Sequence, residues 1–118
     1  MQYLLMIYGE EAAATKLTPE QMQAMYGRYV ALTNEMKEKG VYIGGNPLQP
    51  TATATSVRVR DGQAAITDGP FAETKEQLAG YYLVDCKDLD EALDYAARIP
   101  GAALGTIEVR PVRPMPPA

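Results

Sequence analysis

Two short segments of the chain are apolar on both of their alternating faces. Residues 3–8 read Tyr-Leu-Leu-Met-Ile-Tyr, and residues 81–86 read Tyr-Tyr-Leu-Val-Asp-Cys. Successive side chains of a strand point to opposite sides of a sheet, so neither segment has a polar face to turn to water. We therefore expect two central strands in a sheet that is covered on both faces. Helices on the same chain cover one face, and a second copy of the sheet is the most economical cover for the other, which predicts a homodimer.

Two helices are marked by their N-terminal capping residues. The segment Thr18-Pro19-Glu20-Gln21 has threonine at the N-cap, proline at N1 and glutamine at N3, and Asp88-Leu89-Asp90-Glu91 repeats the capping-box arrangement. Apolar residues recur three and four positions apart after each cap, which predicts helices over 19–39 and 89–99. The apolar stripe of the first helix, expected to face the core, comprises Met22, Met25, Tyr26, Tyr29, Leu32, Thr33 and Met36.

The remaining segments predict short strands and turns. Residues 41–43 favour a strand that stops at the Gly-Gly-Asn-Pro segment 44–47, and a hairpin of 55–60 and 63–67 turns at Asp61-Gly62. A brief helical turn is expected within 72–78, and a last strand over 106–112. The resulting order is that of a split βαβ unit, the ferredoxin-like plan, with an inserted hairpin and both helices on one face of an α+β sheet. We expect a single domain over 1–112 and a proline-rich tail over 113–118.

Composition excludes several classes of protein. The 118 residues carry a net charge of −4 with scattered Lys and Arg, so no basic face is presented to nucleic acid. The absence of histidine excludes His-based triads and His metal ligands, and the single cysteine excludes an intrachain disulfide and a Cys-based zinc site. The apolar run at residues 1–8 is too short for a membrane span and lacks the basic flank of a signal peptide. We expect a cytoplasmic protein without membrane association, metal or organic cofactor.

A longer motif links the hairpin to the second central strand. The segment Val57-Arg58-Val59-Arg60-Asp61-Gly62 continues into Asp68-Gly69-Pro70-Phe71-Ala72-Glu73-Thr74-Lys75-Glu76, then Gly80-Tyr81-Tyr82, and the chain closes with Ile107-Glu108-Val109-Arg110-Pro111-Val112. In these segments the chain resembles the YCII-related family, specifically its DGPF-domain branch. The resemblance spans residues 3–112, and the nine-residue segment is its most specific part.

The resemblance implies a ferredoxin-like dimeric α/β barrel but no settled biochemical function. Related dimeric barrels include muconolactone isomerases and dehalogenating lyases, and smaller YCII-like relatives have a proposed His and Asp pair in a cleft. Because this chain has no histidine, that pair cannot be carried over. DGPF genes are frequently found beside or fused to extracytoplasmic-function sigma factors, which implies a regulatory association.

Asp68 is the first candidate for a functional residue. It precedes Gly69-Pro70, so its carboxylate suits either an Asx turn or N-cap, or a general base at the mouth of a barrel if burial raises its pKa. Lys75 belongs to a charged run with Glu73 and Glu76, which is typical of a solvated face, but its ammonium also suits a carboxylated ligand.

Five further residue positions remain open between a structural role and a ligand role. Arg58 lies on the same strand face as Arg60, which is either exposed to solvent or part of a polar cleft. Tyr8 and Tyr82 lie on the central strands, where packing is the usual role of tyrosine, but a hydroxyl there also suits a ligand cavity, as at Tyr42 and Tyr81. Cys86 is predicted to be a buried apolar residue rather than a nucleophile.

Two functions follow from these observations. The first is a small-molecule-binding dimer in which Asp68, a tyrosine and Arg58 or Lys75 carry out proton-transfer chemistry of lyase or isomerase type without a cofactor. The second is a non-enzymatic accessory or regulatory protein that works with a sigma factor. The residues leave the choice between an enzyme and a binding protein open.

Overall fold

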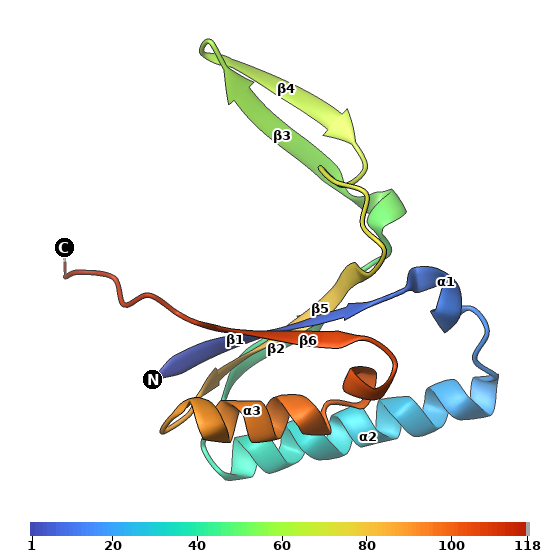
Figure 1. The fold of residues 1–118 in the computed structure, drawn as a ribbon, viewed down its shortest axis with the longest axis vertical. Helices are drawn as coiled ribbons and strands as arrows, with labels where there is room; N and C mark the ends of the chain where they lie inside the picture. The colour runs from blue at the N-terminus through green and yellow to red at the C-terminus, as the bar shows by residue number, and fades with distance from the viewer. Residues whose placement is uncertain (118) are drawn as a thin grey trace.

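The computed structural model, drawn in Figure 1, describes residues 1–117. Four antiparallel strands form its main sheet in the order β2-β5-β1-β6. Their bounds are β1 Gln2–Gly9, β2 Tyr42–Pro47, β5 Gln77–Asp85 and β6 Thr106–Pro111. Two helices, α2 (Pro19–Glu38) and α3 (Leu89–Arg98), lie on the same side of this sheet (Figure 1). The predicted α+β class, the order of the elements and the one-sided helical layer are confirmed.

The short helices and the ends of two strands differ from the prediction. A short helix, α1 (Glu11–Ala14), follows β1, and 3₁₀ turns occur at η1 (Thr51–Thr53) and η2 (Pro100–Ala103). The helical turn expected within 72–78 is wrong: residues 70–76 form bends, and the extended β5 begins at Gln77. β2 also runs through residues 44–47, where the sequence predicted its end. The last strand ends at Pro111, one residue before its predicted end. Residues 113–117 of the predicted tail have no regular structure, and its last residue, 118, lies outside the described residues.

Helix α2 begins where its capping residues predict. The Thr18 hydroxyl accepts a hydrogen bond from the backbone N–H of Gln21 at 3.1 Å, and the Gln21 side chain accepts one from the backbone N–H of Thr18 at 2.9 Å. At α3, the Asp88 carboxylate accepts from the backbone N–H of Glu91, whose own carboxylate accepts from the N–H of Lys87. Both helix starts are therefore fixed by local chemistry.

The core lies between the sheet and the two helices. Leu5 and Val84, from the two central strands, are completely buried, as are Met36 of α2 and Ala92 of α3. Tyr3, Leu32, Val41, Tyr82, Cys86, Tyr95, Ala96 and Ile99 complete the buried cluster. Because alternate residues of β1 and β5 point into this cluster, their other residues point away from the helices.

An ion pair joins the two helices at their exposed surface. The Arg98 guanidinium of α3 donates two hydrogen bonds to the Glu35 carboxylate of α2, and Lys39 donates a third from the next turn. The hydrogen bonds from these cations lower the pKa of Glu35 to about 2, and the contribution of Arg98 is the larger one. The carboxylate is therefore charged at neutral pH and links the two helices.

We call the side of the sheet without helices the open face. Its central part comprises Leu4, Met6 and Tyr8 of β1 with Tyr81 and Leu83 of β5, and the register places Leu4 beside Leu83 and Met6 beside Tyr81. At its edge strand, β6 places Glu108 and Arg110 beside Met6 and Leu4. All five central side chains are only half-buried, so the second apolar side of both strands is not covered within one chain.

The inserted hairpin forms a separate two-stranded sheet. We call it the arm: β3 (Thr55–Arg60) and β4 (Gln63–Asp68), joined at Asp61-Gly62, where both residues have positive φ angles of 55° and 75°. It rises from the main sheet on the side opposite to the helices (Figure 1). The radius of gyration is 16.4 Å, compared with about 13.5 Å for a compact chain of this length. No helix in residues 1–117 has both the length and the apolar character needed to cross a membrane.

Candidate functional site

A cavity of about 510 Å³ lies between α2 and the β2–β5 edge of the sheet. One stripe of α2, with residues three and four positions apart, forms its helical wall: Tyr26, Tyr29, Val30, Thr33, Asn34 and Lys37. The opposite wall comes from the strands and comprises Ile7, Tyr42, Gly45, Asn46, Pro47, Ala79, Gly80, Tyr81 and Tyr82. The tyrosines make this cavity mainly aromatic, and its size falls within the usual range of small-molecule sites.

The sequence predicted a different role for part of this α2 stripe. Tyr26, expected to face the core, is 70% exposed at the edge of the cavity, and Met22 one turn earlier is 55% exposed. Leu32 and Met36, nearer the C-terminal end of the helix, are buried as expected. At 20 residues, or about 30 Å, α2 is twice as long as α3, so its N-terminal half extends past the core. The cavity lies under this longer helix.

The hydrogen bonds of Thr33, Tyr82 and Tyr29 fix which of these hydroxyl groups donates and which accepts. The Thr33 hydroxyl donates to the backbone oxygen of Tyr29 at 2.8 Å, and its oxygen lies 2.8 Å from the Tyr82 hydroxyl. A hydroxyl has one proton, so Tyr82 must donate to Thr33, which leaves a lone pair of the Tyr82 oxygen free to accept. The Tyr29 oxygen accepts from the N–H of Gly101 at 3.1 Å, and its own proton has no acceptor within residues 1–117.

Both phenols remain protonated at neutral pH. Burial is the main cause that raises the pKa of Tyr29 and of Tyr82 above the ordinary value for tyrosine. Neither group is therefore a ready general base. Among the residues that line the cavity, Tyr29 thus keeps a hydroxyl proton and Tyr82 a lone pair without a partner in residues 1–117. The ring centroids of Tyr42 and Tyr82 lie 6.3 Å apart, edge to face, and form part of an aromatic wall.

The charge at the cavity is positive. Lys37 is the sole ionisable side chain other than tyrosine among the described residues that line it, and its ammonium lies 5.1 Å from the centre of the Tyr42 ring. A cation over an aromatic face is held by the ring quadrupole while its other side remains free. The site therefore combines aromatic walls with one cation and has no carboxylate in its lining.

The structure brings one of the five predicted site residues to this cavity, and Tyr42 and Tyr81, for which the sequence left a ligand role open, line it as well. Tyr82 lines it, whereas Tyr8 lies on the open face, where its hydroxyl is 3.9 Å from the Met6 sulfur. Arg58 is exposed on β3 of the arm, and Lys75 is exposed in the segment that precedes β5. Asp68 is exposed at the end of β4. Within one chain these residues do not form a common site.

Asp68 has neither of the surroundings that its two predicted roles require. Its carboxylate accepts no hydrogen bond within residues 1–117, and the turn that follows is held instead by the N–H of Gly69, which donates to the Ala54 oxygen at 2.7 Å, and by the Ser56 hydroxyl, which donates to the Gly69 oxygen. Gly69 has a φ of 94°, which explains the glycine after Asp68. In the isolated chain the carboxylate is also exposed to solvent rather than held in a cleft.

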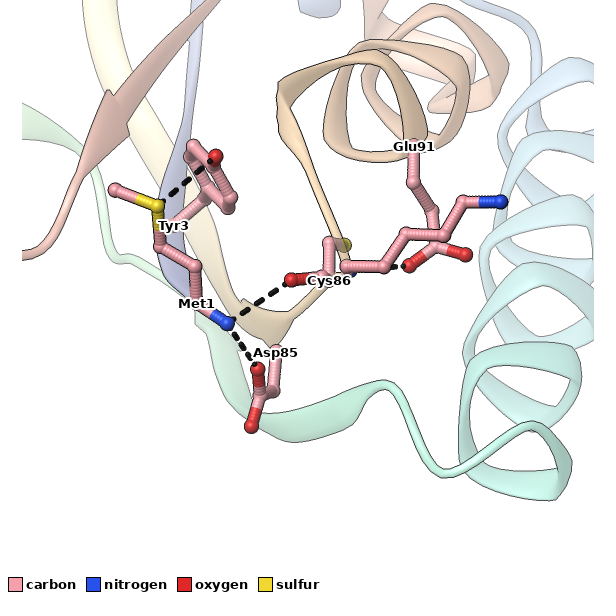
Figure 2. A network of polar contacts seen from close by, with 6 residues as sticks. Met1, Tyr3, Asp85, Cys86 and Glu91 are labelled. Atoms are coloured by element: carbon pink, nitrogen blue, oxygen red, sulfur yellow. Dashed lines mark hydrogen bonds and ion pairs between the residues drawn. The ribbon is translucent and has the colours of Figure 1, made fainter.

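Cys86 lies directly after β5 among groups that disfavour its thiolate. Figure 2 shows it between Met1, whose ammonium donates to the Cys86 oxygen and to the Asp85 carboxylate, and Glu91 of α3. The side chain is 2% exposed. Burial, and then the negative charge of Glu91, raises the thiol pKa to about 11. The structure thus confirms the buried position that the sequence predicts for this cysteine.

We expect alkylation of Cys86 to be slow in the native protein. At pH 8 a thiol of pKa about 11 is about 0.1% thiolate, whereas an ordinary thiol is ionised to more than about 10%, so unfolding in urea should accelerate labelling at least about 100-fold. The native rate should rise with pH up to the raised pKa. Mass spectrometry after timed iodoacetamide treatment measures both rates, and fast native labelling at pH 7 would contradict the burial.

Comparison with known proteins identifies the family and leaves the activity open. The YCII-related domain matches residues 1–116. The chain belongs to the YCII-related family. An uncharacterised protein of Rhizobium meliloti (strain 1021) is 38% identical over 114 residues, covering 95% of this chain and 92% of the relative. The match confirms the family expected for this YCII-related chain, while its DGPF branch stays a prediction.

Sequence reasoning missed most of the cavity residues of this YCII-related chain. The stripe predicted to face the core includes Tyr26, Tyr29 and Thr33, and no sequence pattern singles out Lys37. One signal was present in the sequence, since tyrosine and threonine at core positions carry hydroxyls that a fully apolar core does not use. Their placement on the cavity wall depends on the position of β2 against α2.

Proposed function

We propose that this YCII-related protein binds a small planar aromatic acid in the cavity between α2 and the β2–β5 edge. The observation that carries the proposal is the lining itself: aromatic walls, two directed phenol groups and a single cation at Lys37. Aromatic walls favour a flat apolar ligand, and a few converging polar groups fix its orientation.

The polar groups define what such a ligand should carry. A ring hydroxyl can accept the free proton of Tyr29 and donate its own proton to the free lone pair of Tyr82. A carboxylate on the same ring can pair with the Lys37 ammonium. A hydroxybenzoate-like compound satisfies all three groups and is small enough for about 510 Å³.

Binding is better supported than proton-transfer chemistry. A general base needs a group that is deprotonated at the working pH, and the cavity lining contains no carboxylate and two phenols of raised pKa. Lyase or isomerase chemistry would need a base from outside the cavity, such as Asp68 of a second copy. The association with a sigma factor and the cytoplasmic location stay predictions from the sequence.

The test is titration calorimetry with 4-hydroxybenzoate, its methyl ester and cyclohexanecarboxylate. We expect 4-hydroxybenzoate to bind most tightly because the ester lacks the charge and the cyclohexane compound lacks the flat ring. Lys37→Met should weaken 4-hydroxybenzoate about tenfold, which is about 1.4 kcal/mol, and leave the ester unchanged. Val30→Trp, on the exposed rim of the cavity, should block all three compounds.

The matched control for the charge is Lys75→Met. Lys75 is exposed in the segment before β5 and does not line the cavity, so its removal should not alter binding of any of the three compounds. Equal losses in the two lysine variants, or tighter binding of the cyclohexane compound than of the aromatic acid, would exclude the proposal.

The proposal also includes a dimer in which the open faces of two ferredoxin-like sheets meet and form an α/β barrel. The support is the half-buried apolar centre of the open face, which comprises Leu4, Met6, Tyr8, Tyr81 and Leu83. Two such faces in contact would cover the second apolar side of both central strands. Sedimentation at micromolar concentration should give about twice the chain mass of 12.8 kDa.

A further inference from the structure

The arm has one apolar face that nothing in the chain covers. Directly paired residues of a hairpin share a face, so Val57 and Ile66 lie on the same side as Val59 and Ala64. Val57 is 61% exposed, Val59 60% and Ile66 70%. The opposite face carries Arg58 and other polar groups. An isolated two-stranded hairpin is marginally stable in water, so this apolar face indicates that the arm docks on another surface.

Hydrogen bonds hold the base of the arm, which stands clear of its own sheet. The Glu11 carboxylate accepts hydrogen bonds from both the backbone N–H and the hydroxyl of Thr51, just before β3. The backbone N–H of Glu11 donates to the Gln77 side chain at the start of β5. Together with the bond from Gly69 to Ala54, these contacts hold both ends of the arm.

The direction of the arm points to a second copy of the chain. Figure 1 shows the arm on the side of the sheet that lacks helices, the side of the open face. Any molecule that covers the open face therefore lies beside the arm. In a symmetric pair of identical chains each copy both extends an arm and receives one, so the two contacts are equivalent.

The area of the open face supports this assignment. Four strands about 4.8 Å apart and about 20 Å long present roughly 400 Å², about half of the 800 Å² that each partner of a stable complex usually contributes. One face of a two-stranded arm of the same length adds roughly 200 Å². Each copy would contribute the face of its own arm and the surface that the partner's arm covers, which brings the total contact area to roughly 800 Å² for each copy. Sheet and arms together reach the area of a standard stable interface, whereas the sheets alone supply about half of it.

We propose that, in the dimer, each arm lies along the second copy with Val57, Val59 and Ile66 against it. This inference rests on the dimer included in the proposed function. It also brings Asp68, which pairs with Thr55 and therefore shares the face of Val57, next to the partner, whereas Arg58 lies on the opposite face and stays exposed to solvent.

The test compares the labelling rates of single cysteines placed on the two faces of the arm. Val59→Cys puts a thiol on the apolar face and Ala65→Cys puts one on the opposite face, and both positions are exposed within one chain. The native Cys86 is buried and its pKa is raised to about 11, so its background labelling is slow. We expect the thiol of the Val59→Cys variant to react at least about tenfold more slowly than that of the Ala65→Cys variant.

A second pair of variants measures association directly. Val57→Glu should raise the dimer dissociation constant at least about 30-fold in sedimentation, and Ala65→Glu, on the other face of the arm, less than about threefold. Neither change removes a buried group from the single chain, so both variants should fold, as circular dichroism would verify.

The outcomes separate this inference from the dimer itself. If the wild-type protein is a dimer but the two cysteines react equally and Val57→Glu has no effect, the arm inference is wrong and the sheet dimer stands. If the wild-type protein is a monomer at all concentrations, both are wrong. Slow labelling of the Val59→Cys variant together with a weakened Val57→Glu dimer supports the arm contact.

Discussion

Leu83→Glu is expected to convert the protein into a monomer at micromolar concentration. Leu83 lies at the centre of the open face, where the register pairs it with Leu4 of β1 and Gly44 of β2. When two open faces meet, each glutamate would be buried without a cation and close to its symmetry mate. Burial of an unpaired charge costs several kcal/mol, so we expect the dimer dissociation constant to rise at least about 1000-fold.

Sedimentation equilibrium over a range of concentrations measures this change. The single chain should tolerate the substitution because the side chain points away from the helices, and circular dichroism should match the wild type. Leu104→Glu is the control, since Leu104 is 63% exposed in the turn before β6, outside the open face. A Leu83→Glu protein that sediments as a dimer would exclude the open face as the interface.

Leu5→Ala should cost about 2–5 kcal/mol of unfolding free energy. Leu5 is completely buried on the central strand β1, between Tyr82 of β5 and Val109 of β6, and its side chain packs in the core beneath the helices. Truncation leaves a cavity that the surrounding strands cannot fill because both are held in the hydrogen-bonded sheet. Against a typical total stability of 5–15 kcal/mol, the variant should unfold at a much lower urea concentration.

The control for this loss is Leu5→Met, which retains the side-chain volume and should cost less than about 1.5 kcal/mol. Urea unfolding should be compared at one protein concentration, because dimerisation adds to the apparent stability of the native state. A cost below 1 kcal/mol for Leu5→Ala would mean that this position is not part of a close-packed core.

The helix starts and the hairpin could be predicted because their chemistry is local. Thr18 and Gln21 satisfy each other's backbone N–H groups within one turn, and Asp61-Gly62 supplies the positive φ angles of a two-residue hairpin. These interactions join residues at most three positions apart, so the sequence contains all the information needed.

The extent of β2 and β5 could not be predicted in the same way. Gly45 reads as a strand breaker but lies in β2. A glycine is needed at this position because a Cβ there would come within 2.8 Å of both the Tyr81 backbone oxygen and the Tyr82 ring. Gln77 and Leu78 are extended because they pair with Gly9 and Tyr8 of β1. The cause lies in each case on a different strand, far away in the sequence, so local propensity was overridden by pairing.

Capping, turn chemistry and side-chain alternation act over a few residues, so the two helices, the hairpin and the two-sided apolar character of β1 and β5 follow from the sequence, as does the family. The cavity position of Tyr29 and Thr33, and the arm that stands clear of its own sheet, emerge only when the chain is folded. The cavity depends on where long-range pairing places β2 against the longer helix α2. The direction of the arm depends on contacts such as the one between Glu11 and Thr51, which are 40 positions apart in the chain.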